Sequence, residues 1–443
     1  DYETNDCLSK LPNQVLGLIL SFLTIKEAVQ TCILSHRWMC LRKYVPKLNF
    51  EDSRAMKRIK VSMSKDEIVD WERCCFISFV NRVLEQSLGD IDEMRIKFDL
   101  DNLCKFDIDK WVNFATAREL NKLELDFFPA LLIYRRRPGN KSFLPPKYLY
   151  TVDFKPTLKS LHLNYVNVSN ETVTLLLDSC QLLENLWLEF SEILTSVTSA
   201  SLSLPLKHLT VLYCFKMQTI DVSAPKLLSL TYFGDPIEFN IRSASSFLEL
   251  SVGGDRHVKV AYAFEPLAIY LSQLKYLQLR MRFIHGNNLA IEHSPAFPDL
   301  KHLELYVLAD FNESLLGWIP LIKACPILQK LTLKASHPSL PFAHAFGQPS
   351  WEFHKREGCP LRCLKTLEVF GYYGSRLDDE LITYVLANSV ILSEVILDVT
   401  SLWSMELNED AAIRARKLGD KVPNGAKLVI KRSSSEEIWS LIT

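Results

Sequence analysis

The amino-acid sequence predicts an α/β solenoid, built from a curved parallel sheet with helices and irregular turns on its convex side and preceded by a small three-helix module. Three observations support this fold class. A short leucine motif recurs past residue 110, helical segments precede several copies of it, and three short amphipathic segments open the chain. Hydrophobic residues make up 48% of the 443 positions, which supplies ample material for a long core.

The first element is a helix predicted over residues 11–23, LPNQVLGLILSFL. The run is shorter than the about 20 apolar residues of a membrane span, and no basic region of a signal peptide precedes it, so we expect mature structure. Thr24 and Glu27 have the spacing of a capping box, which predicts a second helix. A third short helix is expected over 36–46, ending at Pro46. Because so small a module buries little surface alone, it should keep an apolar face exposed for a partner helix.

A polar stretch over residues 51–69 is expected to link this module to the remainder of the chain. Beyond it the sequence predicts a helix over 71–86, a strand over 94–98, a helix around 111–117 and a strand over 120–127. These elements would form the N-terminal cap and the first units of the solenoid.

The repeat has the form L-x-x-L-x-L, and its clearest copies are LKSLHL, LENLWL, LKYLQL, LKHLEL, LQKLTL and LKTLEV. Successive copies begin 20 to 38 positions apart, centred on the roughly 20–29 residues of a leucine-rich repeat. Each copy predicts a short strand whose alternate side chains enter a shared core while the others face outward. The copies begin at Leu120, Leu158, Leu183, Leu206, Leu227, Phe247, Leu274, Leu300, Leu328, Leu364 and Leu392.

Some segments depart from a simple strand-and-helix repeat. Between residues 206 and 247, short β-like runs replace helix, which predicts strands on both walls of the solenoid. The segments 134–146 and 336–360 are rich in Pro, Gly and His and are expected to be insertions. Two of the helical segments end at Cys180 and Cys325, three places before a repeat, where a small buried hydrophobic residue fits.

The charge and the cysteines limit the classes of partner and the compartment. Fifty-one basic and 52 acidic residues leave a net charge of −1, so no global field favours nucleic acid or an anionic membrane, and we expect protein or small-molecule partners. The 11 cysteines are odd in number and scattered, which argues against a disulfide framework. The expected location is a reducing compartment, the cytosol or the nucleus.

No motif in the chain indicates bond chemistry. A Gly-rich phosphate loop, a G-x-S-x-G elbow and an H-E-x-x-H motif are all absent from the sequence, which has only 14 glycines. Cys359 and Cys363 lie close after His354, but no further pair with zinc-ligand spacing follows. We therefore expect neither an enzyme, nor a cofactor, nor a metal site.

The opening segment resembles the F-box, which runs Leu-Pro, Ile or Val, I-L-S-x-L, K-x-A-V-x-T and L-S-x-R-W. Residues 359–397 and 424–430 look like the FBD domain that follows leucine-rich repeats in many plant F-box proteins, and residues 111–127 resemble the start of their repeat region. The F-box positions that match are Leu11, Pro12, Val15, Ile19, Leu20, Ser21, Leu23, Lys26, Ala28, Val29, Thr31, Leu34, Ser35, Arg37 and Trp38.

This resemblance implies the substrate-recognition subunit of an SCF-type cullin-RING ubiquitin ligase, whose F-box docks on a Skp-type adaptor. It implies four regions: an F-box over 7–50, a linker over 51–69, leucine-rich repeats over 70–350 and an FBD-like region over 351–432. It places at or near the adaptor interface Leu11, Pro12, Val15, Ile19, Leu20, Leu34, Ser35 and Trp38.

The repeats would hold the target protein on the outward-facing strand positions, since a curved solenoid binds partners on its concave face. Polar residues are ordinary on a solvated sheet face, so the surface as a whole is the prediction rather than any one member. Two alternatives stay open: an interaction protein outside any ligase, and a receptor that binds a small molecule before its target. The candidate target-binding residues are His162, Trp187, His208, Tyr276, Arg280, His302, Tyr306, Lys330 and Lys334.

Overall fold

The computed structural model divides into two compact units, which we describe separately. Unit 1 comprises residues 1–227 and 241–243, and unit 2 comprises 228–240 and 244–443. The structure describes residues 8, 10–23, 25–33, 36–41, 45–61, 66–130, 149–150, 155–254, 264–282, 295–308, 315–336, 360–400, 409–423 and 425–433.

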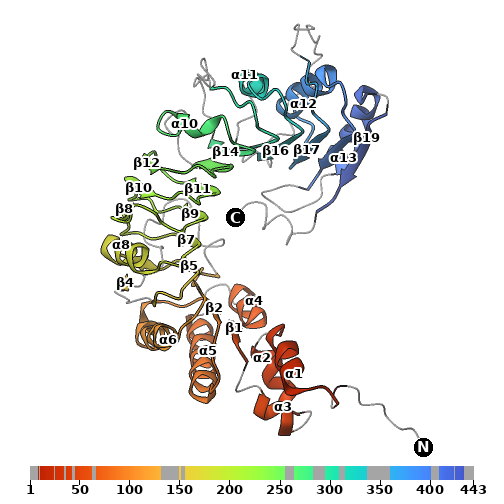
Figure 1. Cartoon of the computed structure of the whole chain (residues 1–443). Coiled ribbons are helices and arrows are strands. Elements are labelled where there is room, and N and C mark those ends of the chain that lie inside the picture. The colour runs from red at the N-terminus through yellow and green to blue at the C-terminus, as the bar shows by residue number, and fades with distance from the viewer. Residues whose placement is uncertain are drawn as a thin grey trace, which may run out of the picture. The chain divides into compact units, whose positions relative to one another are not determined.

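Unit 1 begins with the three predicted helices (Figure 1): α1 (Asn13–Ser21), α2 (Ile25–Gln30) followed by the 3-10 turn η1 (Thr31–Ile33), and α3 (His36–Leu41). Their apolar residues at helical spacing form a small core, since Leu16, Leu20 and Ala28 are fully buried. Among the described residues no helix is long and apolar enough to cross a membrane.

Much of the stretch 51–69, predicted as a linker, has regular secondary structure. Strand β1 (Lys47–Glu51) pairs with β2 (Glu93–Lys97), and helix α4 (Ser53–Val61) packs on α5 (Asp66–Gln86). Polar composition hid this helix, in which Ala55 and Ile59 lie one turn apart and are both buried. Asp52, which lies between β1 and α4, accepts a hydrogen bond from the Ala55 N–H at 3.0 Å and pairs with Lys26 of α2 at 2.6 Å. This ion pair connects α2 of the opening module to the segment that follows β1.

Six strands of unit 1 form a parallel sheet in the order β1-β2-β3-β5-β7-β9. In-register leucines such as Leu161 and Leu186 face the core and are 1% exposed, as the repeat predicts. The other elements are η3 (Asn102–Cys104), α6 (Lys105–Ala117), β3 (Lys122–Asp126), β4 (Leu149–Tyr150), β5 (Ser160–Asn164), β6 (Asn167–Val168), α8 (Asn170–Ser179), β7 (Asn185–Glu189), β8 (Ser196–Thr198), β9 (His208–Leu212) and β10 (Thr219–Ser223).

A second sheet includes β10, inside the segment 206–247 where the sequence predicts extra strands, and β8, which precedes that segment. Strands β8 and β10 pair in parallel, and β12 (Glu238–Arg242) continues this sheet beside β10. The Arg242 guanidinium bridges to Asp221 of β10 at 2.7 Å.

Three aromatic residues that directly follow strands of unit 1 have left-handed backbone. Tyr165, Phe190 and Tyr213 have φ values of 57°, 52° and 52°. Their rings pack from one repeat to the next: the first two are tilted by 34° with centroids 4.5 Å apart, and the last two are stacked with centroids 4.9 Å apart.

Unit 2 is a parallel sheet in the order β11-β13-β14-β15-β16-β17-β18-β19, with α10, α11 and α12 on one side of the strands (Figure 1). Leu303 and Leu331 are in register and fully buried, so the repeat prediction holds here too. The elements are β11 (Ser229–Phe233), β13 (Glu249–Gly253), α10 (Ala268–Leu271), β14 (Tyr276–Arg282), β15 (His302–Leu308), η4 (Leu315–Trp318), α11 (Ile319–Lys323), β16 (Lys330–Ser336), β17 (Thr366–Phe370), α12 (Arg376–Asn388), β18 (Glu394–Asp398), α13 (Glu409–Lys417), η6 (Leu418–Lys421) and β19 (Lys427–Lys431).

The cysteine prediction agrees with the described thiols. Cys180 and Cys325 are buried, free and close to α8 and α11, and burial raises the pKa of both thiols. The segment 134–146 lies outside the described residues, as does nearly all of 336–360.

Candidate protein-interaction surfaces

The opening helices place the expected adaptor residues in different environments. Pro12 and Val15 are exposed, while Leu11 and Ile19 are partly exposed. Leu34 and Ser35 lie outside the described residues.

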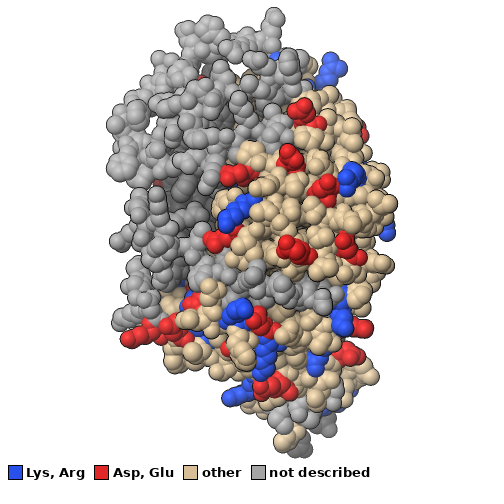
Figure 2. Space-filling view, turned by 90° about the vertical axis from the view of Figure 1, so that its left-hand side faces the viewer, with Lys and Arg blue, Asp and Glu red and all other residues tan. Residues whose placement is uncertain are grey.

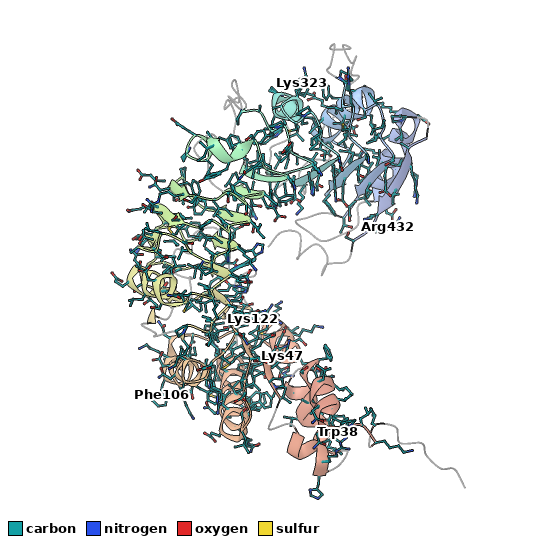
Figure 3. The ribbon with its side chains drawn as sticks, viewed as in Figure 1. Trp38, Lys47, Phe106, Lys122, Lys323 and Arg432 are labelled. Atoms are coloured by element: carbon teal, nitrogen blue, oxygen red, sulfur yellow. The ribbon has the colours of Figure 1, made fainter. Side chains whose placement is uncertain are left out.

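Leu20 and Trp38 belong to the core of the helical module rather than to its surface. Leu20 is fully buried, and Trp38 of α3 is buried among the opening helices (Figure 3). The cause is the packing of three short helices, whose few apolar residues must supply both a core and any outer face.

The structure shows apolar residues on the outside of this module that sequence reasoning missed. Leu18, Phe22 and Ile33 are exposed, Phe22 at 81% and Ile33 at 88%. Val15, Leu18 and Phe22 are spaced three and four positions apart, which places them along one side of α1 and its C-cap, while Leu11 directly precedes the helix. That spacing is the signal that could have found them. We call Leu11, Val15, Leu18, Phe22 and Ile33 the module patch.

The second candidate surface is the strand face, formed by the outward side chains at the first, third and fifth positions of each strand in the two parallel sheets. On unit 1, His162 stacks against Trp187 with ring centroids 4.9 Å apart. The Trp187 indole N–H donates to Glu189 at 3.0 Å. Burial lowers the pKa of His162, so this ring is neutral near pH 7. His208 is partly exposed on β9, beside Asn185 of β7.

On unit 2 the candidate residues contact one another. The Tyr276 hydroxyl donates to Glu304 at 3.3 Å, and Lys334 pairs with the same carboxylate at 2.7 Å. The guanidinium of Arg280 lies 4.5 Å from the ring centroid of Tyr306. Tyr306 and Lys334, both expected on the target-binding face, are buried and offer little surface in the free chain.

Two further candidates on unit 2 are held at the edge of this network. His302 lies 2.9 Å from the Thr332 hydroxyl, and burial lowers its pKa. Lys330 bridges to Glu368 at 2.7 Å. The carboxylates Glu304 and Glu368, which sequence reasoning did not include among the candidates, occupy the same position of their repeats.

Charge is mixed on the surface. Figure 2 shows acidic and basic side chains interspersed on one face of the molecule, in keeping with the net charge of −1. His354 and Cys359 lie outside the described residues, and Cys363 is a half-buried free thiol, so the absence of a metal site stays a prediction.

Comparison with known proteins shows which family the chain belongs to. A family model described as "At1g61320/AtMIF1, LRR domain" matches residues 90–421, which is most of the chain. The chain belongs to this leucine-rich-repeat family. The predicted α/β leucine-rich-repeat solenoid is thereby confirmed.

Curated relatives of this leucine-rich-repeat protein carry F-box names. The FBD-associated F-box protein At5g60610 of Arabidopsis thaliana is 27% identical over 86% of this chain and 96% of its own length. The F-box/LRR-repeat protein At5g38396 of the same plant is 26% identical over 97% of both chains. The F-box/FBD/LRR-repeat protein At1g13570, also from Arabidopsis thaliana, is 25% identical over 93% of this chain and 95% of its own length. The resemblance to plant F-box/FBD/LRR-repeat proteins is confirmed.

Proposed function

We propose that this chain is the substrate-recognition subunit of an SCF-type ubiquitin ligase. The exposed module patch supports this role most directly, because it provides apolar surface on a segment that resembles the F-box. The F-box names of the relatives support it as well. In this role the module patch contacts a Skp-type adaptor, and through it the cullin and RING subunits.

The strand faces of the repeats hold the target protein in this proposal. The chain itself transfers no ubiquitin; it raises the local concentration of the target near the subunits that do. The proposed location is the cytosol or the nucleus, where such ligases act.

The experiment compares two phenylalanines of nearly equal exposure. Phe22 in the module patch is 81% exposed, and Phe106 on α6 is 80% exposed and points away from the sheet (Figure 3). We expect Phe22→Ser to weaken capture by a purified Skp-type adaptor about 30-fold, the equivalent of about 2 kcal/mol for an interface anchor. Phe106→Ser should leave capture unchanged, because it removes the same side chain from a different surface.

Equal capture by the two variants would contradict the adaptor interface and favour an interaction protein outside the ligase. Trp38 is a poor probe, because replacing a buried tryptophan costs about 3–5 kcal/mol of stability and would unfold the module. Affinity purification with mass spectrometry names the target and separates a protein substrate from a small ligand.

A further inference from the structure

Glu189, the last residue of β7, is a buried carboxylate that lacks the cation its neighbours have. It is 9% exposed, and within the described part of the chain it has no ion pair. The described side chain that donates to it is the neutral indole of Trp187, at 3.0 Å. Other buried carboxylates of the strand faces do have ion pairs: Glu124 with Arg95 at 2.7 Å, Asp126 with Lys97 at 3.4 Å, Glu304 with Lys334 at 2.7 Å and Glu368 with Lys330 at 2.7 Å.

A second unmatched acceptor lies directly beside Glu189. Asn164 of β5 is its register partner and is 8% exposed. The Asn164 amide N–H donates to Asp126 at 3.0 Å, which fixes the orientation of the amide, since a flipped amide would set two oxygens against each other. Its Oδ1 is buried and accepts no hydrogen bond from the described residues. Leaving such an acceptor unmatched costs free energy that a donor would recover.

Trp187 adds an aromatic surface to these two acceptors. Its ring is partly exposed, and its N–H directs the edge of the ring at the Glu189 carboxylate. Aromatic rings next to carboxylates attract organic cations, most strongly when the cation is partly removed from water. The neutral His162 ring packed against the indole adds no opposing positive charge.

We propose that Glu189, Asn164 and Trp187 receive an arginine or lysine side chain of the target protein. The site offers acceptors and an aromatic ring, and these two side chains carry donors, a positive charge and no acceptor. A guanidinium matches best, because it can bond both acceptors in its plane and also stack on an indole. The occupant's origin in the target rests on the proposed function; the preference for a cation rests on the geometry alone.

The test uses the full chain and three short peptides, Ac-Gly-Xaa-Gly-NH2, in which Xaa is arginine, lysine or citrulline. Citrulline has nearly the shape of arginine without its charge. Binding is followed by the NMR signal of the Trp187 indole N–H, assigned with Trp187→Phe. We expect the arginine and lysine peptides to shift this signal, and citrulline to leave it in place.

A matched pair of variants identifies the carboxylate. Glu189→Gln keeps the shape and should lower affinity for the arginine peptide about tenfold or more, because a charge-assisted hydrogen bond is lost. Glu249→Gln, at an exposed carboxylate on β13, should have no effect. Equal shifts with arginine and citrulline, or unchanged affinity in Glu189→Gln, would overturn the proposal. Thermal melting of each variant checks that it is folded.

The pH dependence gives a second readout. Burial raises the pKa of Glu189 to about 7, with repulsion from Asp126 of β3 acting in the same direction, so affinity for the arginine peptide should rise between pH 6 and 8. The ionisable groups on the outward side of the strands flanking β7 are His162 of β5 and His208 of β9, and Asp126 is itself paired with Lys97. Glu189→Gln should abolish the rise and His208→Asn should preserve it; the reverse result would assign the effect to the histidine and refute the site.

The peptide assay and the adaptor assay fail independently. Peptide binding by a chain that captures no adaptor would keep the cation site and reject the ligase role. Adaptor capture without peptide binding would keep the ligase role and reject the cation site.

Discussion

The strand faces of the two units use similar residues to different effect. In unit 2 the buried carboxylate of Glu304 receives hydrogen bonds from a tyrosine, a glutamine amide and the Lys334 ammonium. In unit 1 the buried carboxylate of Glu189 receives one from the described side chains, the indole N–H of Trp187. The repeat fixes where each side chain points, whereas residues on neighbouring strands decide whether its charge is matched. A polar strand face is therefore not a recognition surface everywhere, and its unmatched part is the best candidate.

The largest expected effect tests the matched side of this comparison. Lys334→Met removes the cation from Glu304 where both groups are buried, so the remaining carboxylate is left uncompensated. We expect the free energy of unfolding to fall by about 3–5 kcal/mol in urea denaturation at pH 7. A loss below about 1 kcal/mol would show that water, rather than Lys334, solvates Glu304.

The next effect has the opposite sign and tests the unmatched side. The pKa of Glu189 is about 7 in the folded chain, against 4.5 for an ordinary glutamate, so the folded state binds the proton more tightly. Stability from this group is therefore lost as pH rises from about 4.5 to 7. Glu189→Gln removes this loss, and we expect it to stabilise the chain by about 1–3 kcal/mol at pH 8 and by little at pH 4. Equal effects at both pH values would refute the raised pKa.

The smallest effect uses a partly exposed ion pair of unit 2. Lys330 is partly exposed, and Glu368 also has Lys431 within 3.8 Å, so Lys330→Met leaves the carboxylate with a cation. The expected loss is about 0–1 kcal/mol, and thermal melts in low and high salt measure it. A loss of stability as large as that of Lys334→Met would show that burial does not decide how much these ion pairs contribute.

The repeats could be predicted from sequence because each depends on a local pattern. Strands begin two residues after Leu158, Leu183 and Leu300, as the motif requires, and those leucines are buried. Helix α4 escaped prediction because its two buried residues stand among charged ones. The isolation of Glu189 could not be predicted, because it depends on Asn164 and Asp126, which lie 25 and 63 residues away in sequence. Spacing places apolar residues on one side of α1, but their exposure could not be predicted, because which of the module's few apolar residues are buried depends on how the three helices pack together.

The left-handed residues after β5, β7 and β9 limit how this part of the chain can evolve or be redesigned. A non-glycine residue in that conformation costs about 1–2 kcal/mol, and the ring of the next repeat compensates through stacking. The N–H groups of Tyr165 and Phe190 donate at 3.0 Å to carbonyls one repeat further on, which locks the turns together. A repeat inserted here without its own aromatic residue would break the row of ring contacts from Tyr165 to Tyr213. We therefore expect these three repeats to tolerate transfer to another protein only when they are moved together.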